Sequence, residues 1–194
     1  MTNVFGGGQG GCGTEIDLDC DDSSGAFGAD FLGEPFTCLT DGVPICDDDV
    51  VLSSDTSIEE VYVTISPPTI LDGSNEYLDL TGPVFVSAFG VGTSEIIFSN
   101  PGGASKGDFQ NALKATVYAN SANPLTDGPR KVEVYFIDAN GNTSPTAIAY
   151  ISATQLQNVF ADIGPDVTIC EDESILLTAT YPGATYHWST GQTS

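Results

Sequence analysis

A run rich in acidic residues extends from Glu15 to Asp22 and is the part of this chain best suited to bind a cation. Asp17, Asp19 and Asp21 alternate with apolar residues, which is the period of a half-buried strand. This alternation predicts a strand that buries its apolar side chains and lines its other face with carboxylates. Neighbouring carboxylates repel one another unless a cation lies between them. The run is therefore a candidate calcium site, because calcium binds carboxylate, carbonyl and amide oxygens.

The ligands of this candidate site must come from more than one segment. Alternate carboxylates of one strand lie roughly 7 Å apart, so they cannot all share one ion. The turn residues Asp21 and Asp22 are therefore expected to matter more than Asp17 and Asp19, with help from distant loops. The predicted metal ligands are Asp17, Asp19, Asp21, Asp22, Asp138 and Asn140. Further loop candidates are Asn142, Asp47, Asp48 and Asp49.

The acidic run is not an EF-hand loop. Asp22 stands where that loop needs a glycine, and Gly28 stands where it needs its closing glutamate. Three interpretations stay open: a calcium site, an acidic face without an ion, and a catalytic pair of carboxylates. Two carboxylates can hydrolyse a glycoside, but with 27 acids in the chain any pair is unremarkable. No Gly-x-Ser-x-Gly elbow is present. We expect a protein that is not an enzyme.

The chain has five cysteines, which are Cys12, Cys20, Cys38, Cys46 and Cys170. None forms a Cys-x-x-Cys pair, and one histidine cannot complete a common zinc set. Cys38 and Cys46 bracket an Asp-Gly turn, which predicts a disulfide across a hairpin, with Cys12–Cys20 as the second bridge. Cys170 is then left over, and its partner is expected beyond residue 194. The alternative that all five are buried thiols stays open.

Composition limits the partners of the chain. Its 194 residues carry a formal charge of −23, from 27 acids and 4 bases. Nucleic-acid binding is excluded, because it depends on neutralising phosphates with Lys and Arg. Docking on anionic lipid is disfavoured for the same reason, and no apolar run is long enough to insert into a membrane. Hydrophobic residues make up 40% of the chain, which is enough for a folded core.

The elements that must position the acids are short strands between Gly- and Pro-rich turns. The predicted strands are Glu15–Asp21, Pro35–Leu39, Val50–Ser54, Glu59–Ile65, Glu76–Leu80, Val84–Phe89, Glu95–Ser99, Ala115–Tyr118, Arg130–Ile137 and Thr146–Ala153. One helix is predicted at Lys106–Ala115, with Phe109 and Leu113 in the core. The fold class is therefore all-β, an antiparallel β-sandwich. We expect a Gly-rich linker at 1–14, this sandwich at 15–154, and the first half of a second, incomplete Ig-like sandwich at 155–194.

Two segments of the chain resemble known families. Residues 15–154 resemble a cadherin-like repeat of giant bacterial surface proteins, through the acidic run, Glu59–Ile65, Gly107–Asn120 and Pro129–Asp138. Cys20, Cys38 and Cys46 depart from the usual repeat and suggest a variant reinforced by disulfides. Residues 162–194 resemble the first half of an Ig-like repeat of secreted Bacteroidetes proteins, through Asp162–Cys170 and Tyr181–Gly191. In that family the early cysteine commonly pairs with one near the end of the domain, which fits Cys170.

The resemblance implies a function and a location. Such repeats occur in large adhesins and gliding-motility surface proteins, often exported by the type IX secretion route. We expect a structural segment of an extracellular adhesin or surface filament, stiffened by calcium and disulfides and located on the bacterial cell surface. Its expected partners are neighbouring repeats or copies of itself, with surface glycans as a further candidate. The alternative is a carbohydrate-binding module of a secreted enzyme, which would show Tyr62, Tyr77 or Tyr135 in an exposed row.

Overall fold

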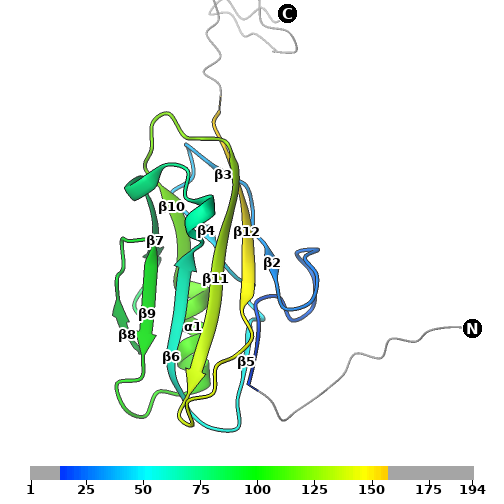
Figure 1. Ribbon diagram of the computed structural model, residues 1–194, viewed down its shortest axis with the longest axis vertical. Helices are drawn as coiled ribbons and strands as arrows, with labels where there is room; N and C mark the ends of the chain where they lie inside the picture. The colour runs from blue at the N-terminus through cyan, green and yellow to red at the C-terminus, as the bar shows by residue number, and fades with distance from the viewer. Residues whose placement is uncertain (1–13, 157–194) are drawn as a thin grey trace, which may run out of the picture. The chain divides into compact units, whose positions relative to one another are not determined.

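The computed structural model describes residues 14–156, which fold into a two-layered β-sandwich with one α-helix (Figure 1). The predicted all-β class is confirmed. The chain divides into two units, Met1–Gln155 and Leu156–Ser194, and the described residues belong to the first unit except for Leu156. The predicted linker up to residue 13, the predicted Ig-like strands, Cys12 and Cys170 lie outside the described residues.

The first layer is a large sheet with the strand order β2-β12-β11-β6-β9-β8. Its strands are β2 (Phe31–Leu32), β12 (Ala147–Thr154), β11 (Gly128–Asp138), β6 (Ile58–Ile65), β9 (Glu95–Ser99) and β8 (Ser87–Phe89), and β3 (Phe36–Thr37) also pairs with β12. The pairs are antiparallel, except that β2 and β3 run parallel to β12.

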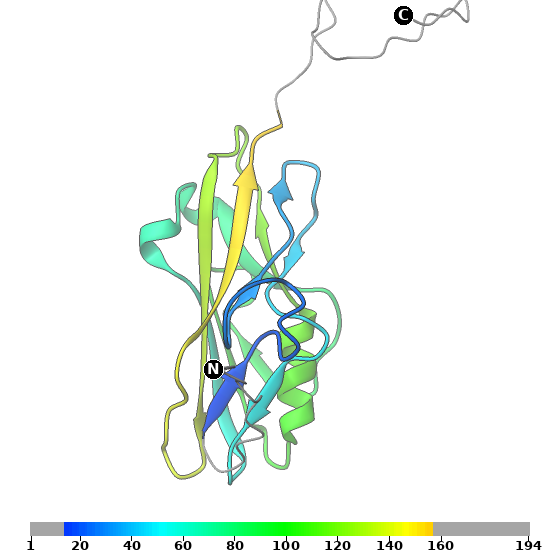
Figure 2. The ribbon, with the colours of Figure 1, turned by 90° about the vertical axis from the view of Figure 1, so that its right-hand side faces the viewer.

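The second layer combines two small sheets with the helix. Its elements are β4 (Val43–Pro44), β10 (Thr116–Asn120), β7 (Glu76–Leu80), the pair β1 (Glu15–Asp17) and β5 (Val51–Ser53), and the helix α1 (Lys106–Ala115). The short 3-10 helices η1 (Pro67–Thr69) and η2 (Gly73–Asn75) connect β6 to β7. Figure 1 shows α1 behind β6 and β11, and Figure 2 shows β1 in dark blue beside β5 in cyan.

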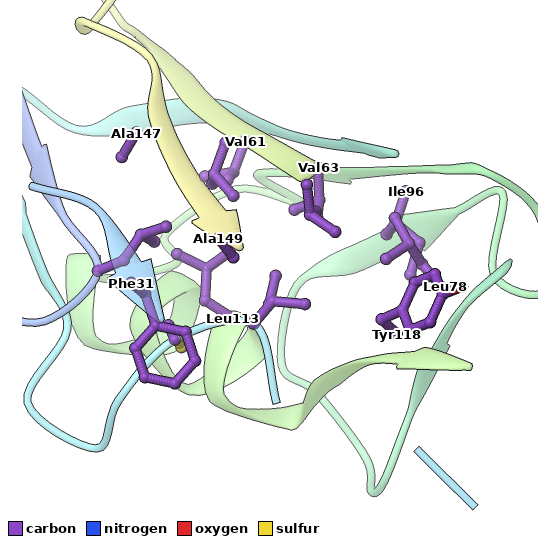
Figure 3. Packing of buried hydrophobic residues seen from close by; sticks show 14 of the residues in the cluster. Phe31, Val61, Val63, Leu78, Ile96, Leu113, Tyr118, Ala147 and Ala149 are labelled. Atoms are coloured by element: carbon purple, nitrogen blue, oxygen red, sulfur yellow. The ribbon is translucent and has the colours of Figure 1, made fainter. Parts of the chain in front are cut away.

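The core lies between the two layers and follows the two-residue period of the strands. Val61 and Val63 of β6 and Ala147 and Ala149 of β12 are buried, as is Leu113 of the helix. Figure 3 shows these side chains gathered in one cluster.

The helix α1 begins and ends as the sequence predicts. A capping box starts it, because the backbone N–H of Asp108 donates to the Ser105 hydroxyl and the backbone N–H of Ser105 donates to the Asp108 carboxylate. Phe109 and Leu113 are fully buried. On its other side, the Gln110 amide donates to the carbonyl of Val50 at 2.6 Å, so the helix also supports the approach to β5.

A buried ionic network joins β7 to β11 and β10. The guanidinium of Arg130 is fully buried and contacts Glu76 at 2.9 Å and Asp72 at 3.2 Å. The hydroxyl of Tyr118 donates at 3.0 Å to Oε2 of Glu76, the same oxygen that Arg130 contacts. Among the described residues, both ion pairs belong to Arg130. These ion pairs therefore connect parts of the fold to one another, and neither of them involves the acidic run.

The predicted disulfide between Cys38 and Cys46 is wrong, since both thiols are free. Cys38 lies inside the tight turn Thr37–Thr40, where its side chain is exposed, whereas Cys46 is buried beyond β4. Strand β3 pairs with β12 and strand β4 pairs with β10, so the turn joins two different sheets and the flanking cysteines do not face each other. Cys20 is also free and exposed, while its predicted partner Cys12 lies outside the described residues.

Candidate metal site

Four carboxylates converge at one end of the β1–β5 pair, and they belong to Asp19, Asp21, Asp47 and Asp49. One oxygen of each carboxylate lies within 4.8 Å of the corresponding oxygens of the other three. The antiparallel register causes this convergence. Because Asp17 lies opposite Val51, the segment that follows β1 runs against the segment that precedes β5.

Asp19 is the buried member of the cluster, with 1% of its surface exposed. Its carboxylate accepts the backbone N–H of Ser23 at 3.0 Å and the backbone N–H of Ser24 at 2.9 Å. Burial raises the pKa of Asp19, but the hydrogen bonds from Ser24 and Ser23 outweigh burial and the net pKa is lowered. Asp19 is therefore held ionised although water scarcely reaches it.

The alternation predicted for Glu15–Asp21 stops at Asp17, where β1 ends. Leu18 and Asp19 are both buried, because the chain turns inward after the strand instead of continuing along it. The prediction that Asp19 points outward is therefore wrong, and the group of converging carboxylates includes Asp19 but not Asp22. The signal for the turn is the Ser-Ser-Gly sequence that closes the acidic run.

Asp22 shapes the loop and stands outside the cluster. Its φ is 56°, in the left-handed region that aspartate tolerates better than most residues. Its backbone N–H donates to the carbonyl of Asp19 at 3.0 Å, which closes the turn, and its side chain is exposed. The turn at Asp22 brings Ser23 and Ser24 back onto the Asp19 carboxylate.

Three hydrogen bonds tie the acidic loop to the segment before β5. The backbone N–H of Asp47 donates to the carbonyl of Leu18 at 2.8 Å. The backbone N–H of Cys20 donates to the Asp49 carboxylate at 3.1 Å, and the Ser23 hydroxyl donates to Asp47 at 2.9 Å. The two segments thus hold their carboxylates against each other in spite of the repulsion between them.

The pKa of Asp17 is affected by the negative charge of the neighbouring carboxylates. Its pKa is raised, first by burial and then by the charges of Asp22, Asp19 and Asp49. A hydrogen bond from the backbone N–H of Asp19, at 3.1 Å, opposes the shift without cancelling it. No Lys or Arg forms an ion pair with the cluster in the part of the chain that the structure describes.

The spacing of the oxygens bears on which ion the cluster could hold. Calcium binds oxygen at about 2.3–2.6 Å, so two ligands on opposite sides of one ion lie about 4.6–5.2 Å apart. Magnesium binds at about 2.0–2.1 Å, which allows about 4.2 Å. The four oxygens lie within 4.8 Å of one another, an upper limit that admits an ion of either size. Carbonyl groups and water would complete the six to eight ligands that calcium takes.

Asp138 and Asn140, predicted as ligands, belong to a different turn. The Asp138 carboxylate accepts the backbone N–H groups of Asn140 and Asn142, each at 2.9 Å, and the Ser54 hydroxyl at 3.2 Å. Ser54 follows the end of β5 that lies farther from Asp49, so this turn and the acidic cluster lie at opposite ends of the β1–β5 pair. These hydrogen bonds, led by the side-chain amide of Asn142, lower the pKa of Asp138 to about 2.

The structure thus brings together two of the six predicted ligands, Asp19 and Asp21. It joins them to Asp47 and Asp49 from the further loop candidates. Asp17, Asp22, Asp48 and Asp138 stand outside the cluster, and Asn140 and Asn142 bond to Asp138 in its own turn. An Asp-x-Asp spacing occurs in both segments, and it selects the four residues of the cluster together with Asp17.

The tyrosines expected in an exposed row do not form one. Tyr62 and Tyr135 lie opposite each other on β6 and β11, and their rings stack with centroids 4.8 Å apart. Tyr77 lies on β7, in the other layer. Each stacked ring therefore covers one face of its partner, which leaves no flat platform of three rings.

No protein-family model, curated protein or solved structure matches this chain. Within residues 14–156, no helix is both long and apolar enough to cross a membrane.

Proposed function

We propose that this chain is a structural segment of an extracellular adhesin or surface filament, and that calcium bound by Asp19, Asp21, Asp47 and Asp49 stiffens it. The observation that carries the proposal is the convergence of these four carboxylates, within 4.8 Å, without a basic partner among the described residues. Such a cluster is costly to assemble without a cation. If calcium is bound, each of the four carboxylates is attracted to the same ion, and this attraction offsets their repulsion.

The position of the cluster suits a mechanical role. Strand β1 has three residues and pairs with β5 alone among the described strands, so it holds the start of the module weakly. An ion shared by Asp19 and Asp21 on one side and Asp47 and Asp49 on the other would clamp this segment to the body. Tension that enters through the preceding residues would then meet the clamp before it reached the core.

An extracellular setting supports calcium as the ion. Sites of extracellular modules bind calcium with dissociation constants of about 10⁻⁴–10⁻³ M, which suits a medium rich in the ion. The formal charge of −23 is also reduced there by divalent cations. The resemblance to cadherin-like and Ig-like repeats supports the assignment to bacterial surface adhesins, including gliding-motility proteins exported by the type IX route. Neighbouring repeats or copies of the chain are the proposed partners, and no catalytic role is proposed.

Thermal unfolding with calcium and with chelator tests this function. Calcium at about 100 times its dissociation constant adds about 2.7 kcal/mol to the free energy of unfolding. For a domain of this size that raises the Tm by about 5–10 °C. An equal ionic strength of sodium chloride is the control for general screening of the negative charge.

Two variants make the test specific. Asp49→Asn removes a carboxylate of the cluster, whereas Asp48→Asn removes an equal charge from the exposed neighbour that stands outside it. We expect the calcium-dependent rise in Tm to be lost in the first variant and retained in the second. A Tm that is indifferent to calcium in the unaltered protein would leave the proposal without support.

A further inference from the structure

Tyr62 of β6 and Tyr135 of β11 form a stacked pair on the outer face of the large sheet. The two residues lie directly opposite each other in the antiparallel register, and both side chains are half-buried. Their ring centroids are 4.8 Å apart and their ring planes are inclined by 4°. This separation lies within the range of offset-stacked aromatic pairs, so the two rings are in contact with each other.

Oxidative coupling is the reaction open to two phenols in this arrangement. A phenol that loses one electron and its hydroxyl proton becomes a phenoxyl radical, whose unpaired electron is shared with the ring carbons next to the oxygen. Two such radicals that lie side by side join through a bond between these carbons. The reaction depends on proximity, because a radical without a second ring beside it is consumed by other reactions.

Glu60 supplies an acceptor for one of the two protons. The hydroxyl of Tyr62 donates to Oε2 of Glu60 at 2.5 Å, a distance typical of a hydrogen bond to an ionised carboxylate. This hydrogen bond, together with burial and the charge of Glu60, raises the pKa of Tyr62 to about 12. Tyr62 is therefore protonated at neutral pH, and its oxidation releases a proton onto a carboxylate that already holds the hydroxyl.

Within residues 14–156, no other two tyrosine rings contact each other. Tyr118 is fully buried, and Tyr77 lies on β7 in the other layer. Tyr150 lies on β12, where its ring is covered by a lysine and has no tyrosine beside it. The pair of Tyr62 and Tyr135 is thus the place in the described chain where coupling within one molecule requires no rearrangement.

We propose that Tyr62 and Tyr135 are a site of oxidative cross-linking, where a peroxide joins β6 to β11 through a carbon–carbon bond between the two rings. Each phenol gives up one electron and its hydroxyl proton; Glu60 takes the proton of Tyr62, and water takes that of Tyr135. The bond forms between ring carbons next to the oxygens, and the hydrogen on each of these carbons then moves to the oxygen, which restores both hydroxyls. The two electrons break the oxygen–oxygen bond of the peroxide, and with the two protons they convert hydrogen peroxide to two molecules of water.

Such a bond would fasten the middle of the large sheet. Strands β6 and β11 are neighbours inside the order β2-β12-β11-β6-β9-β8, and Figure 1 shows them side by side. A covalent link between two strands restricts the unfolded chain in the way that a disulfide does. This effect suits the structural role proposed above, but the cross-linking depends neither on that role nor on the acidic cluster.

Oxidation of the intact chain by persulfate, a peroxide, with a photo-excited ruthenium complex tests the proposal, because both reagents are small. The exposed thiols are first alkylated, so that they do not consume the oxidant. The product should be a monomer that has lost two hydrogen atoms and shows the fluorescence of dityrosine. Trypsin cuts after Lys106 and Lys131, so the new bond should hold together the two peptides that contain Tyr62 and Tyr135.

Tyrosine variants locate the bond. Tyr62→Phe and Tyr135→Phe keep the stacked ring but remove the hydroxyl, and each should lower the yield of linked monomer at least about tenfold. Tyr150→Phe is the matched control, since Tyr150 is also a half-buried tyrosine of the large sheet, and it should leave the yield unchanged. Circular dichroism checks that each variant folds.

A second pair of variants tests the proton acceptor. Glu60→Gln should slow the formation of linked monomer at least about threefold, because an amide does not take up a proton at neutral pH. Glu133→Gln is the matched control, since Glu133 is a half-buried acid of β11 and the described hydroxyl of Tyr62 donates to Glu60 instead. This control should couple at the rate of the unaltered chain.

Three outcomes would overturn the proposal. The first is the absence of linked monomer under conditions that couple free tyrosine. The second is an equal yield from Tyr62→Phe and the unaltered chain, which would place the bond elsewhere. The third is a product that consists of linked dimers, which would assign the coupling to contact between copies. Equal rates in Glu60→Gln and Glu133→Gln would remove Glu60 from the step.

Discussion

Arg130 and Glu76 form a fully buried charge pair with a nitrogen–oxygen distance of 2.9 Å. Compared with apolar residues of the same volume, the pair adds little to the free energy of unfolding. Removal of one partner, however, leaves the charge of the other buried without its counterion. Asp72 and the hydroxyl of Tyr118 complete the network. At the scale of single residues, this network is the feature of the fold least tolerant of change.

We predict that Glu76→Gln lowers the free energy of unfolding by about 3–5 kcal/mol, because it leaves the Arg130 charge buried with a single carboxylate. Urea unfolding measures the loss. Glu95→Gln is the control, since Glu95 is exposed and a surface change of this kind stays within about 0.5 kcal/mol. Equal effects of the two variants would contradict the role of the network.

The turn at Asp138 predicts a dependence of stability on pH. Its pKa is lowered from 3.8 to about 2 by hydrogen bonds that form only in the folded chain. Between these two values the unfolded chain binds the proton and the folded chain does not, so stability falls as the pH falls through this window. Above pH 3.8 the contribution of Asp138 is fully present.

Asp138→Asn should therefore unfold with a shallower dependence on pH between about 4 and 2 than the unaltered chain. Urea unfolding in chelator, at a series of pH values, gives the two curves. The lowered pKa values of Asp19 and Asp72 keep some slope in the variant. Curves of equal slope would show that the Asp138 turn does not hold its carboxylate as described.

At the scale of elements, regular periodicity explains which predictions succeed. The helix Lys106–Ala115 and the strands Glu76–Leu80 and Glu95–Ser99 have the predicted bounds. Strands β2 and β4 have two residues each, which is too short for any period to appear in the sequence. Their positions are set by pairing with β12 and β10, and such contacts between distant segments cannot be read from local pattern.

The sequence predicts a metal site in the acidic run, but it does not predict which residues converge there. Local alternation gives every acid of the run the same outward direction, whereas the turn after Leu18 buries Asp19. Asp47 and Asp49 join Asp19 and Asp21 because β1 pairs with β5, a register that the sequence does not state.

The three described cysteines differ in exposure, because Cys20 and Cys38 are exposed and Cys46 is buried. Burial raises the pKa of Cys46 to about 12, so its thiol is neutral and shielded at physiological pH. We expect a thiol reagent to modify Cys20 and Cys38 in the folded chain and to reach Cys46 only after unfolding. A peptide that links Cys38 to Cys46 in non-reducing mass spectrometry would contradict the arrangement of β3 and β4.

At the scale of the whole molecule, the acidic residues differ in whether a basic residue pairs with them. Two acids neutralise Arg130 in the interior, while four others converge at the end of the β1–β5 pair without a base. A medium with free divalent ions would relieve this repulsion at one point and fasten the start of the module to its body.

Isothermal titration of calcium into the chain tests whether the four carboxylates bind one ion. We predict one calcium ion bound per chain, lost in Asp21→Asn and retained in Asp22→Asn. These two neighbours are both exposed and lose the same charge, but Asp21 alone contributes an oxygen to the cluster. Heat that fits one site in the unaltered chain and in Asp22→Asn would support the account. No saturable calcium binding, or equal loss in both variants, would contradict it.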